Sequence, residues 1–112
     1  MVQTISRDEL KAKIDRHDDF LLVETLPEVA YQHAHLPGAI NMPLEQVKTL
    51  AAKLLPDKHA DNVVYCAGPT RHASENAARE LAAMGYTNVR DYAEGKSDWI
   101  DAGLPIESAH KH

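Results

Sequence analysis

The apolar residues of this chain alternate between two spacings, one typical of buried strands and one typical of helices. Continuous apolar runs at 20–23 and 63–65 predict short strands buried on both faces of a parallel sheet. Two further strands are expected at 39–41, after a Leu-Pro-Gly turn, and at 88–92. Strand-like pieces are therefore distributed along the whole chain rather than gathered at one end.

Helical segments separate these strand-like pieces. Ser6 and Glu9 have the spacing of a capping box, which predicts a helix that carries Leu10 and Ile14 toward a core. Apolar residues at helical spacing, a helix-starting proline and glycine stop signals predict further helices at 28–32, 44–54, 73–84 and 97–103.

The repeated alternation of strand and helix predicts an α/β fold, in which helices cover both faces of a parallel sheet. In such sheets ligands bind beyond the carboxyl ends of the strands. With 112 residues the chain has room for one core, so we expect a single domain over residues 1–112. Residues 107–112 are expected to form a flexible tail.

Composition narrows the choice of partners and compartment. The chain has 12 Lys and Arg residues against 17 Asp and Glu residues, a net charge of −5, which argues against nucleic acid or an anionic membrane as the main partner. Its first residues are not a basic start followed by an apolar run, and no stretch is long enough to cross a membrane. One cysteine allows no internal disulfide, so we expect a cytoplasmic protein.

That cysteine, Cys66, lies where a strand ends and a short loop leads into a helix. A thiol at this point faces unpaired backbone N–H groups and the positive end of a helix dipole, and both favour the nucleophilic thiolate. Arg71 and His72 add basic side chains nearby. A buried cysteine is by default an ordinary apolar residue, but the loop spacing and Arg71 favour a reactive role.

Several segments resemble the single-domain rhodaneses, a family of sulfurtransferases. The segment 35–41, His-Leu-Pro-Gly-Ala-Ile-Asn, resembles the family's H-[IL]-P-G-A-x-N, and the stretch from Cys66 to Arg71 has the length of its active-site loop. Gly-Tyr-Thr-Asn-Val at 85–89 and the Glu-Gly, Trp and Gly-Leu-Pro-Ile motifs within 94–106 resemble its later segments. The similarity extends over nearly the whole chain and does not depend on one motif.

The resemblance implies a central five-stranded parallel sheet and a Cys66 that carries a persulfide. It implies transfer of a sulfane sulfur from a donor such as thiosulfate to cyanide, a small thiol or a protein acceptor, in two covalent steps. It also implies that the active-site loop binds the donor through Ala67, Gly68, Pro69, Thr70, Arg71 and His72. Glu24 and His35 would support this site, and no cofactor or metal is expected.

The loop departs from the family's usual Cys-x-x-Gly-x-Arg-Ser. Its glycine stands third, Pro69 stands fourth, and His72 replaces the serine. Because proline has no N–H, the loop has one donor fewer, for which the Thr70 hydroxyl is a candidate replacement. Upstream, the family's Asp-x-Arg is Glu24-Thr25-Leu26, which keeps a carboxylate and loses the arginine. These departures favour a donor or acceptor other than thiosulfate and cyanide.

Two other functions stay open. Cysteine phosphatases also place Cys and Arg at the ends of a strand-to-helix loop, with five residues between them where this chain has four, 67–70. The shorter loop is too tight to hold a tetrahedral oxyanion well. The second alternative is a non-catalytic sulfur carrier or regulatory module that docks on a partner enzyme.

The histidine pairs at 33/35 and 110/112 have the spacing of metal ligands. No third ligand accompanies either pair, so a zinc site is not expected. We interpret His35 as a turn residue that bonds to the backbone. Trp99 is expected in the core or in a pocket wall. Tyr92, Glu94 and Lys96 lie either at the pocket rim or in an ordinary solvated loop.

Overall fold

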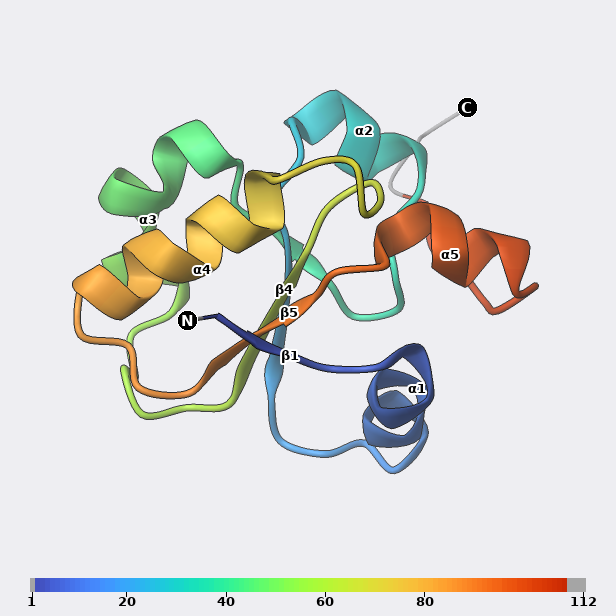
Figure 1. Cartoon of the computed structure of the whole chain (residues 1–112), viewed down its shortest axis with the longest axis horizontal. Coiled ribbons are helices and arrows are strands. Elements are labelled where there is room, and N and C mark those ends of the chain that lie inside the picture. Colours follow the sequence, from blue (N-terminus) through green and yellow to red (C-terminus); the bar gives the residue numbers. More distant parts are fainter. Residues whose placement is uncertain (1, 109–112) are drawn as a thin grey trace.

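A computed structural model of the chain describes residues 2–108. Its centre is one sheet of five strands in the order β1-β5-β4-β2-β3, and every pair of neighbours is parallel (Figure 1). The strands are β1 (Gln3–Thr4), β2 (Leu21–Glu24), β3 (Ile40–Asn41), β4 (Asn62–Tyr65) and β5 (Val89–Tyr92). The α/β fold and the parallel sheet expected from the sequence are confirmed.

Helices cover both faces of this sheet (Figure 1). They are α1 (Arg7–Asp15), α2 (Glu28–His33), α3 (Val47–Leu54), preceded by the 3₁₀ turn η1 (Leu44–Gln46), α4 (Ala73–Ala83) and α5 (Gly95–Asp101). One core lies between the sheet and α3 and α4, and a second lies between the sheet and α1 and α5. The central strands β2 and β4 therefore place alternate residues in alternate cores.

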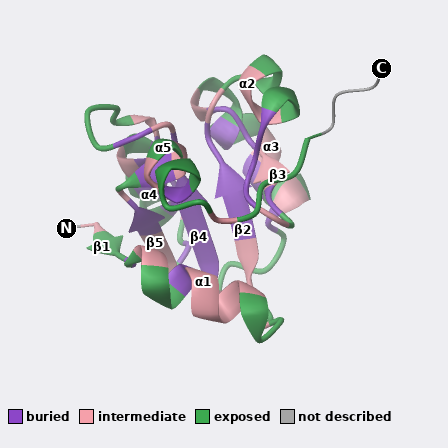
Figure 2. Cartoon of the chain, turned by 90° about the vertical axis from the view of Figure 1, so that its right-hand side faces the viewer, coloured by how far each residue is buried: buried purple, intermediate pink, exposed green. Residues whose placement is uncertain are grey.

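Strand β4 shows this alternation most clearly. Val63 and Tyr65 belong to the core under α1 and α5, whereas Val64 belongs to the core under α3 and α4. All four residues of the strand are buried, and Figure 2 shows β4 enclosed while the edge strand β1 is exposed. Continuing the alternation by two residues from Val64 turns the Cys66 side chain toward α4.

The expected elements agree with the structure in most places and differ in three. The helix expected over 44–54 begins as the 3₁₀ turn η1, and α5 begins two residues before Ser97. Strand β1 was not among the elements predicted from the hydrophobic pattern. The capping box is confirmed, since the Ser6 side chain accepts the Glu9 N–H and Glu9 in turn binds the Ser6 backbone.

Two residues expected in a flexible tail, Glu107 and Ser108, contact the rest of the domain. Glu107 forms an antiparallel bridge with His35, in which each backbone N–H donates to the other's carbonyl. The Ser108 hydroxyl donates to the Gln32 carbonyl. These backbone bonds fix residues that composition alone assigned to the tail. Residues 109–112, which include His110 and His112, lie outside the described part of the chain.

Candidate functional site

Cys66 follows the last residue of β4, and its side chain is 1% exposed. The Ser74 hydroxyl donates a hydrogen bond to Sγ at 3.3 Å. The thiol in turn faces the carbonyl oxygens of Gly68 and Arg71 at 3.9 and 3.7 Å. Within residues 2–108, these three contacts are the hydrogen bonds of Sγ.

The start of α5 holds the first half of the loop in place. The N–H of Lys96 donates to the Cys66 carbonyl at 2.8 Å, and the N–H and hydroxyl of Ser97 donate to the Ala67 carbonyl at 2.9 and 2.7 Å. Gly95 makes this approach possible because a Cβ at that position would lie 2.7 Å from both the Cys66 oxygen and the Gly68 nitrogen. Its φ of +74° also favours glycine.

This anchoring orients the N–H groups of the loop. In a trans peptide the N–H points opposite to the C=O, so the N–H groups of Ala67 and Gly68 point away from α5. Among the described residues, neither these two groups nor the N–H of Thr70 donates to a protein acceptor. The loop therefore has three backbone N–H donors that no described residue uses and that are available to an outer sulfur or an anion.

Arg71 and its neighbours form the outer half of the loop. The side chains of Pro69, Thr70, Arg71 and His72 are all exposed. The Arg71 guanidinium makes no hydrogen bond or ion pair with residues 2–108, whereas His72 lies 3.5 Å from Glu75. His72 occupies the N-cap position of α4 without capping it, and the Thr70 hydroxyl has no protein partner in the described chain. Among the described residues, the outer half of the loop thus carries a cation and a hydroxyl that have no protein partner.

Two polar residues near the thiol were not predicted from the sequence. Ser74 lies in the first turn of α4 on the same face as Ala77, Ala78 and Leu81, and all four are buried. Asp91 pairs with Val64 across the sheet and is 4% exposed, with its Oδ1 lacking any hydrogen-bond partner among the described residues. Burial raises the pKa of Asp91, nearby Glu75 raises it further, and a hydrogen bond with Ser74 partly opposes the rise.

Sequence signals for both residues exist. Ser74 is the one hydroxyl within an otherwise apolar i, i+3, i+4, i+7 stripe, and Asp91 shares the period-two face of Val89 in its strand.

Glu24 and His35, expected to support the site, do not contact the sulfur. Glu24 is fully buried, and its carboxylate accepts from the Tyr65 hydroxyl at 2.8 Å and from the Lys96 ammonium at 3.0 Å. Burial and the Glu24 charge together raise the pKa of Tyr65. The His35 ring binds the Tyr31 carbonyl at 2.8 Å and stacks on the Tyr31 ring, so its predicted bond to the backbone is confirmed.

Lys96 is not a rim or solvent residue, and the same holds for Tyr92. The Lys96 ammonium also donates to the carbonyls of Ala30 and Ala34, so it ties α5 to α2 as well as to β2. Lys96 thus supplies the cation that pairs with the buried Glu24 carboxylate. Tyr92 is buried and donates to Asp98 at 2.7 Å, Trp99 is in the core, and Glu94 is exposed.

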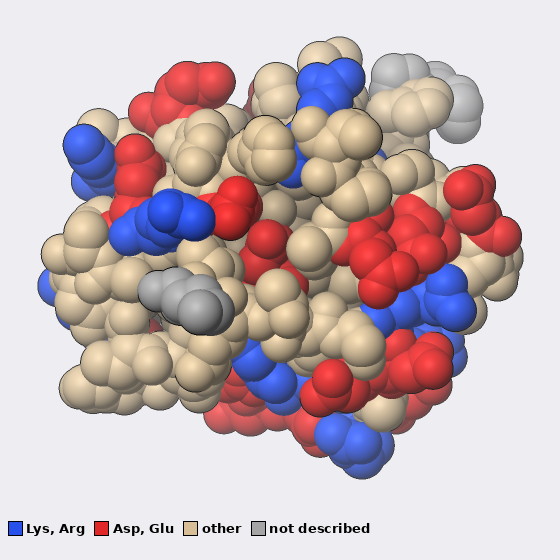
Figure 3. Space-filling view, viewed as in Figure 1, with Lys and Arg blue, Asp and Glu red and all other residues tan. Residues whose placement is uncertain are grey.

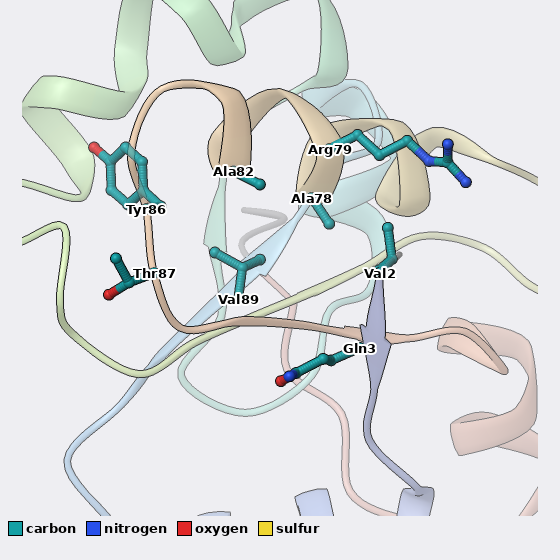
Figure 4. Close-up of a pocket in the computed structure, with 8 residues that line it drawn as sticks. All are labelled: Val2, Gln3, Ala78, Arg79, Ala82, Tyr86, Thr87 and Val89. Carbon is teal, nitrogen blue, oxygen red and sulfur yellow. The ribbon is translucent and has the colours of Figure 1, made fainter.

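Two cavities lie along α4. One, of about 250 Å³, adjoins the loop and is lined in part by Pro69, Arg71, His72 and Asp91. The other, of about 300 Å³, lies between α4, β5 and β1 and includes no residue of the loop (Figure 4). The described residues contain no group of three or more His, Cys, Asp or Glu side chains placed to hold a metal ion.

The surface around these elements carries charges of both signs. Figure 3 shows acidic and basic side chains interspersed over one face, with acidic groups gathered over α5. Within residues 2–108, no helix has the length and apolar character needed to cross a bilayer.

Comparison with known proteins identifies the family to which this chain belongs. The Rhodanese-like domain family matches residues 6–102, and the chain belongs to this family. A solved structure of an Escherichia coli rhodanese with anions has a TM-score of 0.65 and 34% identity, covering 79% of this chain and 96% of that one. The fold and the resemblance noted in the sequence are therefore both confirmed.

Three curated relatives show how varied the proteins with this domain are. Thiosulfate sulfurtransferase PspE of Escherichia coli is 43% identical over 61 residues, which cover 54% of this chain and 57% of PspE. The transcriptional regulator Rv0324 of Mycobacterium tuberculosis is 33% identical over a region that covers 92% of this chain and 44% of Rv0324. YrkF of Bacillus subtilis, a candidate sulfur carrier protein, is 26% identical, with coverages of 88% and 51%. The chain thus spans about half the length of each of these relatives.

Proposed function

We propose that this chain is a sulfurtransferase that carries a sulfane sulfur as a persulfide on Cys66. The donor is a small sulfane-sulfur compound such as thiosulfate, and the acceptor is cyanide, a small thiol or a protein thiol. The observation that carries the proposal is the closed loop from Cys66 to Arg71, which combines a held thiol, N–H groups without protein partners and an exposed cation. Family membership supports the same chemistry.

The proposed cycle has two balanced steps. The Cys66 thiolate attacks the outer sulfur of thiosulfate, a new S–S bond forms, and the bond to the sulfonate sulfur breaks so that sulfite leaves with the electron pair. An acceptor such as cyanide then attacks the outer sulfur, becomes thiocyanate and returns the Cys66 thiolate. The free N–H groups of the loop stabilise the anionic outer sulfur between the steps, and the Arg71 guanidinium attracts the anionic donor.

The decisive experiment is intact-mass measurement after incubation with thiosulfate, mercaptopyruvate or glutathione persulfide. We expect a species heavier by one sulfur atom, absent in Cys66→Ser, that returns to the starting mass when cyanide or a thiol is added. Because the chain has one cysteine, the added mass reports on Cys66 directly. If no donor produces this species in the unmodified chain, the sulfurtransferase proposal fails.

A second candidate is a sulfur carrier that accepts sulfur but releases it only to a docked partner protein. The similarity to YrkF and the nearly complete burial of Cys66 favour it. A carrier would gain the sulfur in the mass experiment and then show no turnover with cyanide or small thiols. Steady-state production of thiocyanate would favour the enzyme.

A further inference from the structure

The cavity of about 250 Å³ that adjoins the active-site loop lies next to the reacting sulfur. Its ionisable lining residues come from the loop, α4 and β5, and they are Arg71, His72, Glu75, Arg79 and Asp91. The Arg71 carbonyl lies 3.7 Å from Sγ, so a residue that lines the cavity also contacts the thiol. Ser74, which immediately precedes Glu75, donates to Sγ at 3.3 Å. A ligand in this cavity would therefore be separated from the sulfur only by the loop that holds it.

The charged groups of the cavity divide into a paired set and an unpaired set. Glu75 accepts from Arg79 at 3.0 Å and lies 3.5 Å from His72, so these three groups serve one another. The exposed Arg71 guanidinium makes no hydrogen bond or ion pair with residues 2–108. Asp91 Oδ1 likewise has no hydrogen-bond partner among the described residues. One cation and one carboxyl oxygen are thus left for a ligand to use.

The Asp91 side chain lies on the cavity side of the sheet. Asp91 pairs with Val64, and Val64 belongs to the core under α3 and α4, so both side chains lie on the face that α4 covers. Asp91 is 4% exposed, and this burial raises its pKa because the charged form is poorly solvated. A bound cation would relieve that cost, and an ammonium group supplies a cation with three hydrogen-bond donors.

The cavity suits a small ligand that carries charges of both signs. Its volume lies below the roughly 300–1,000 Å³ of sites for drug-sized ligands, which favours a ligand of about the size of one amino acid. A guanidinium binds a carboxylate through two parallel hydrogen bonds, and a buried carboxylate is matched by an ammonium group. An α-amino acid carries a carboxylate and an ammonium group on one carbon atom.

We propose that this cavity binds the sulfur acceptor, a free α-amino acid with a thiol side chain, with Arg71 on its carboxylate and Asp91 on its ammonium group. This inference rests on the proposed function, because it names the acceptor class of that cycle. The acceptor reacts as a thiolate after releasing its proton to water. It attacks the outer sulfur of the Cys66 persulfide, a new S–S bond forms, and the bond to Sγ breaks so that Cys66 leaves with the electron pair as a thiolate. The product is the persulfide of the amino acid.

Arg71 serves both steps of the cycle, whereas Asp91 serves only the second. In a two-step exchange the first product leaves before the acceptor binds, so the guanidinium that attracted an anionic donor is free again for the acceptor's carboxylate. A dianionic donor gains nothing from a carboxylate. Asp91 therefore selects the acceptor without assisting the donor.

The test is an NMR titration of the reduced, nitrogen-15-labelled chain with S-methylcysteine, a thioether that cannot accept sulfur. The backbone amides of the cavity residues should shift and saturate. Methylthiopropanoate lacks the ammonium group and methylthioethylamine lacks the carboxylate, so each should bind about tenfold more weakly through the loss of one charge-assisted contact. Equal dissociation constants for the three compounds, or no saturable shift at the cavity, overturn the proposal.

Two variants assign the two contacts. Arg71→Met should bind S-methylcysteine no better than it binds methylthioethylamine, and Asp91→Asn should bind S-methylcysteine no better than it binds methylthiopropanoate. Asp101→Asn, at an exposed position of α5, is the control and should keep both differences. A variant of Arg71 or Asp91 that keeps the difference assigned to it overturns the proposal. If Asp91→Asn does not fold, the three compounds on the unmodified chain still test the ammonium contact.

These titrations use neither a sulfur donor nor a persulfide, so they can fail separately from the proposed function. A chain that forms the persulfide but does not discriminate among the three compounds would retain the sulfurtransferase proposal and lose this acceptor class. A chain that binds S-methylcysteine with both differences but forms no persulfide would retain the amino-acid site and lose the sulfurtransferase proposal.

Discussion

The loop from Cys66 to His72 lies between α5 on one side and α4 on the other, and the two sides treat buried polar groups differently. On the α5 side, Glu24 and Lys96 form a buried ion pair in which both carboxylate oxygens and the ammonium are hydrogen-bonded. On the α4 side, Asp91 leaves one buried oxygen without a partner among the described residues.

This difference in pairing suggests different roles for the two sides, one in holding the loop in place and one in the chemistry of the thiol. Charges that are fully paired fix α5, and through it the carbonyls of Cys66 and Ala67. Groups that are short of partners can change their protonation state without breaking the framework, and such groups are where natural folds place chemistry. We expect the α5 side to govern stability and the α4 side to govern the state of the thiol.

The largest expected effect on stability comes from breaking the buried Glu24–Lys96 ion pair on the α5 side. Lys96→Met leaves the Glu24 carboxylate buried without its cation and should lower the free energy of unfolding by about 3–5 kcal/mol. Urea unfolding measures this loss. Adding Glu24→Gln to Lys96→Met should recover part of it, because no uncompensated charge remains. Lys48→Met, at an exposed position of α3, is the control and should change stability by no more than about 0.5 kcal/mol. Equal losses in the two lysine variants would contradict the supporting role.

The next effect comes from the contact between α5 and the loop. In Gly95→Ala the new Cβ would meet the Cys66 oxygen and the Gly68 nitrogen at 2.7 Å, and φ is +74°. The strained conformation costs roughly 1–2 kcal/mol and the overpacking adds roughly 1–3 kcal/mol. Gly38→Ala is a matched control, since its φ is +78° with no atom within 4 Å of the added Cβ. Urea unfolding should show the larger loss for Gly95→Ala, and equal losses would mean that backbone conformation alone matters.

On the α4 side, stability should depend on pH through Asp91. Burial raises the pKa of Asp91 above its usual 3.8 in the folded protein. Between pH 3.8 and the folded pKa of Asp91, the folded state binds more protons than the unfolded chain. The free energy of unfolding therefore falls as the pH rises through this range. Above the folded pKa, Asp91 causes no further change in stability. Asp91→Asn does not titrate, so its stability relative to the unmodified chain should rise across the same window.

Urea unfolding of both proteins at about pH 4 and about pH 7 checks this prediction. Asp101→Asn, an exposed carboxylate on α5, controls for the loss of a surface charge. A difference between Asp91→Asn and the unmodified chain that stays the same at both pH values would refute the prediction.

Some elements of the fold could be predicted from the sequence and others could not. Local pattern was sufficient for β2, β4 and the helix after Cys66, because their apolar residues repeat at strand or helix spacing. It was insufficient for β1, whose two residues are polar and exposed and which exists only through pairing with β5. A two-residue edge strand has no periodicity to detect.

The candidate site divides in a similar way. The spacing from Cys66 to Arg71 is local, and it predicted a loop that the structure contains. The role of Lys96 depends on Glu24, 72 residues away, and no local rule distinguishes a lysine that turns inward from one in solvent. Ser74 and Asp91 were detectable as polar residues on buried faces, but their closeness to the thiol follows from the β4–β5 register, which one sequence does not state.

The smallest effect on stability, and the most selective effect on chemistry, is expected at Arg71. Its guanidinium is exposed and makes no hydrogen bond or ion pair with the described residues, so Arg71→Ala should change the free energy of unfolding by no more than about 0.5 kcal/mol. Persulfide formation with the dianion thiosulfate should slow roughly tenfold, the value of one charge-assisted contact at a partly solvated site. A neutral dialkyl trisulfide should react at nearly the same rate in both proteins, because it offers no charge to the guanidinium. Arg79→Ala removes a guanidinium that is already paired with Glu75 and is the control for the loss of a positive charge nearby. Equal slowing with both donors, or slowing that parallels a loss of stability, would show that Arg71 maintains the loop rather than attracting the donor.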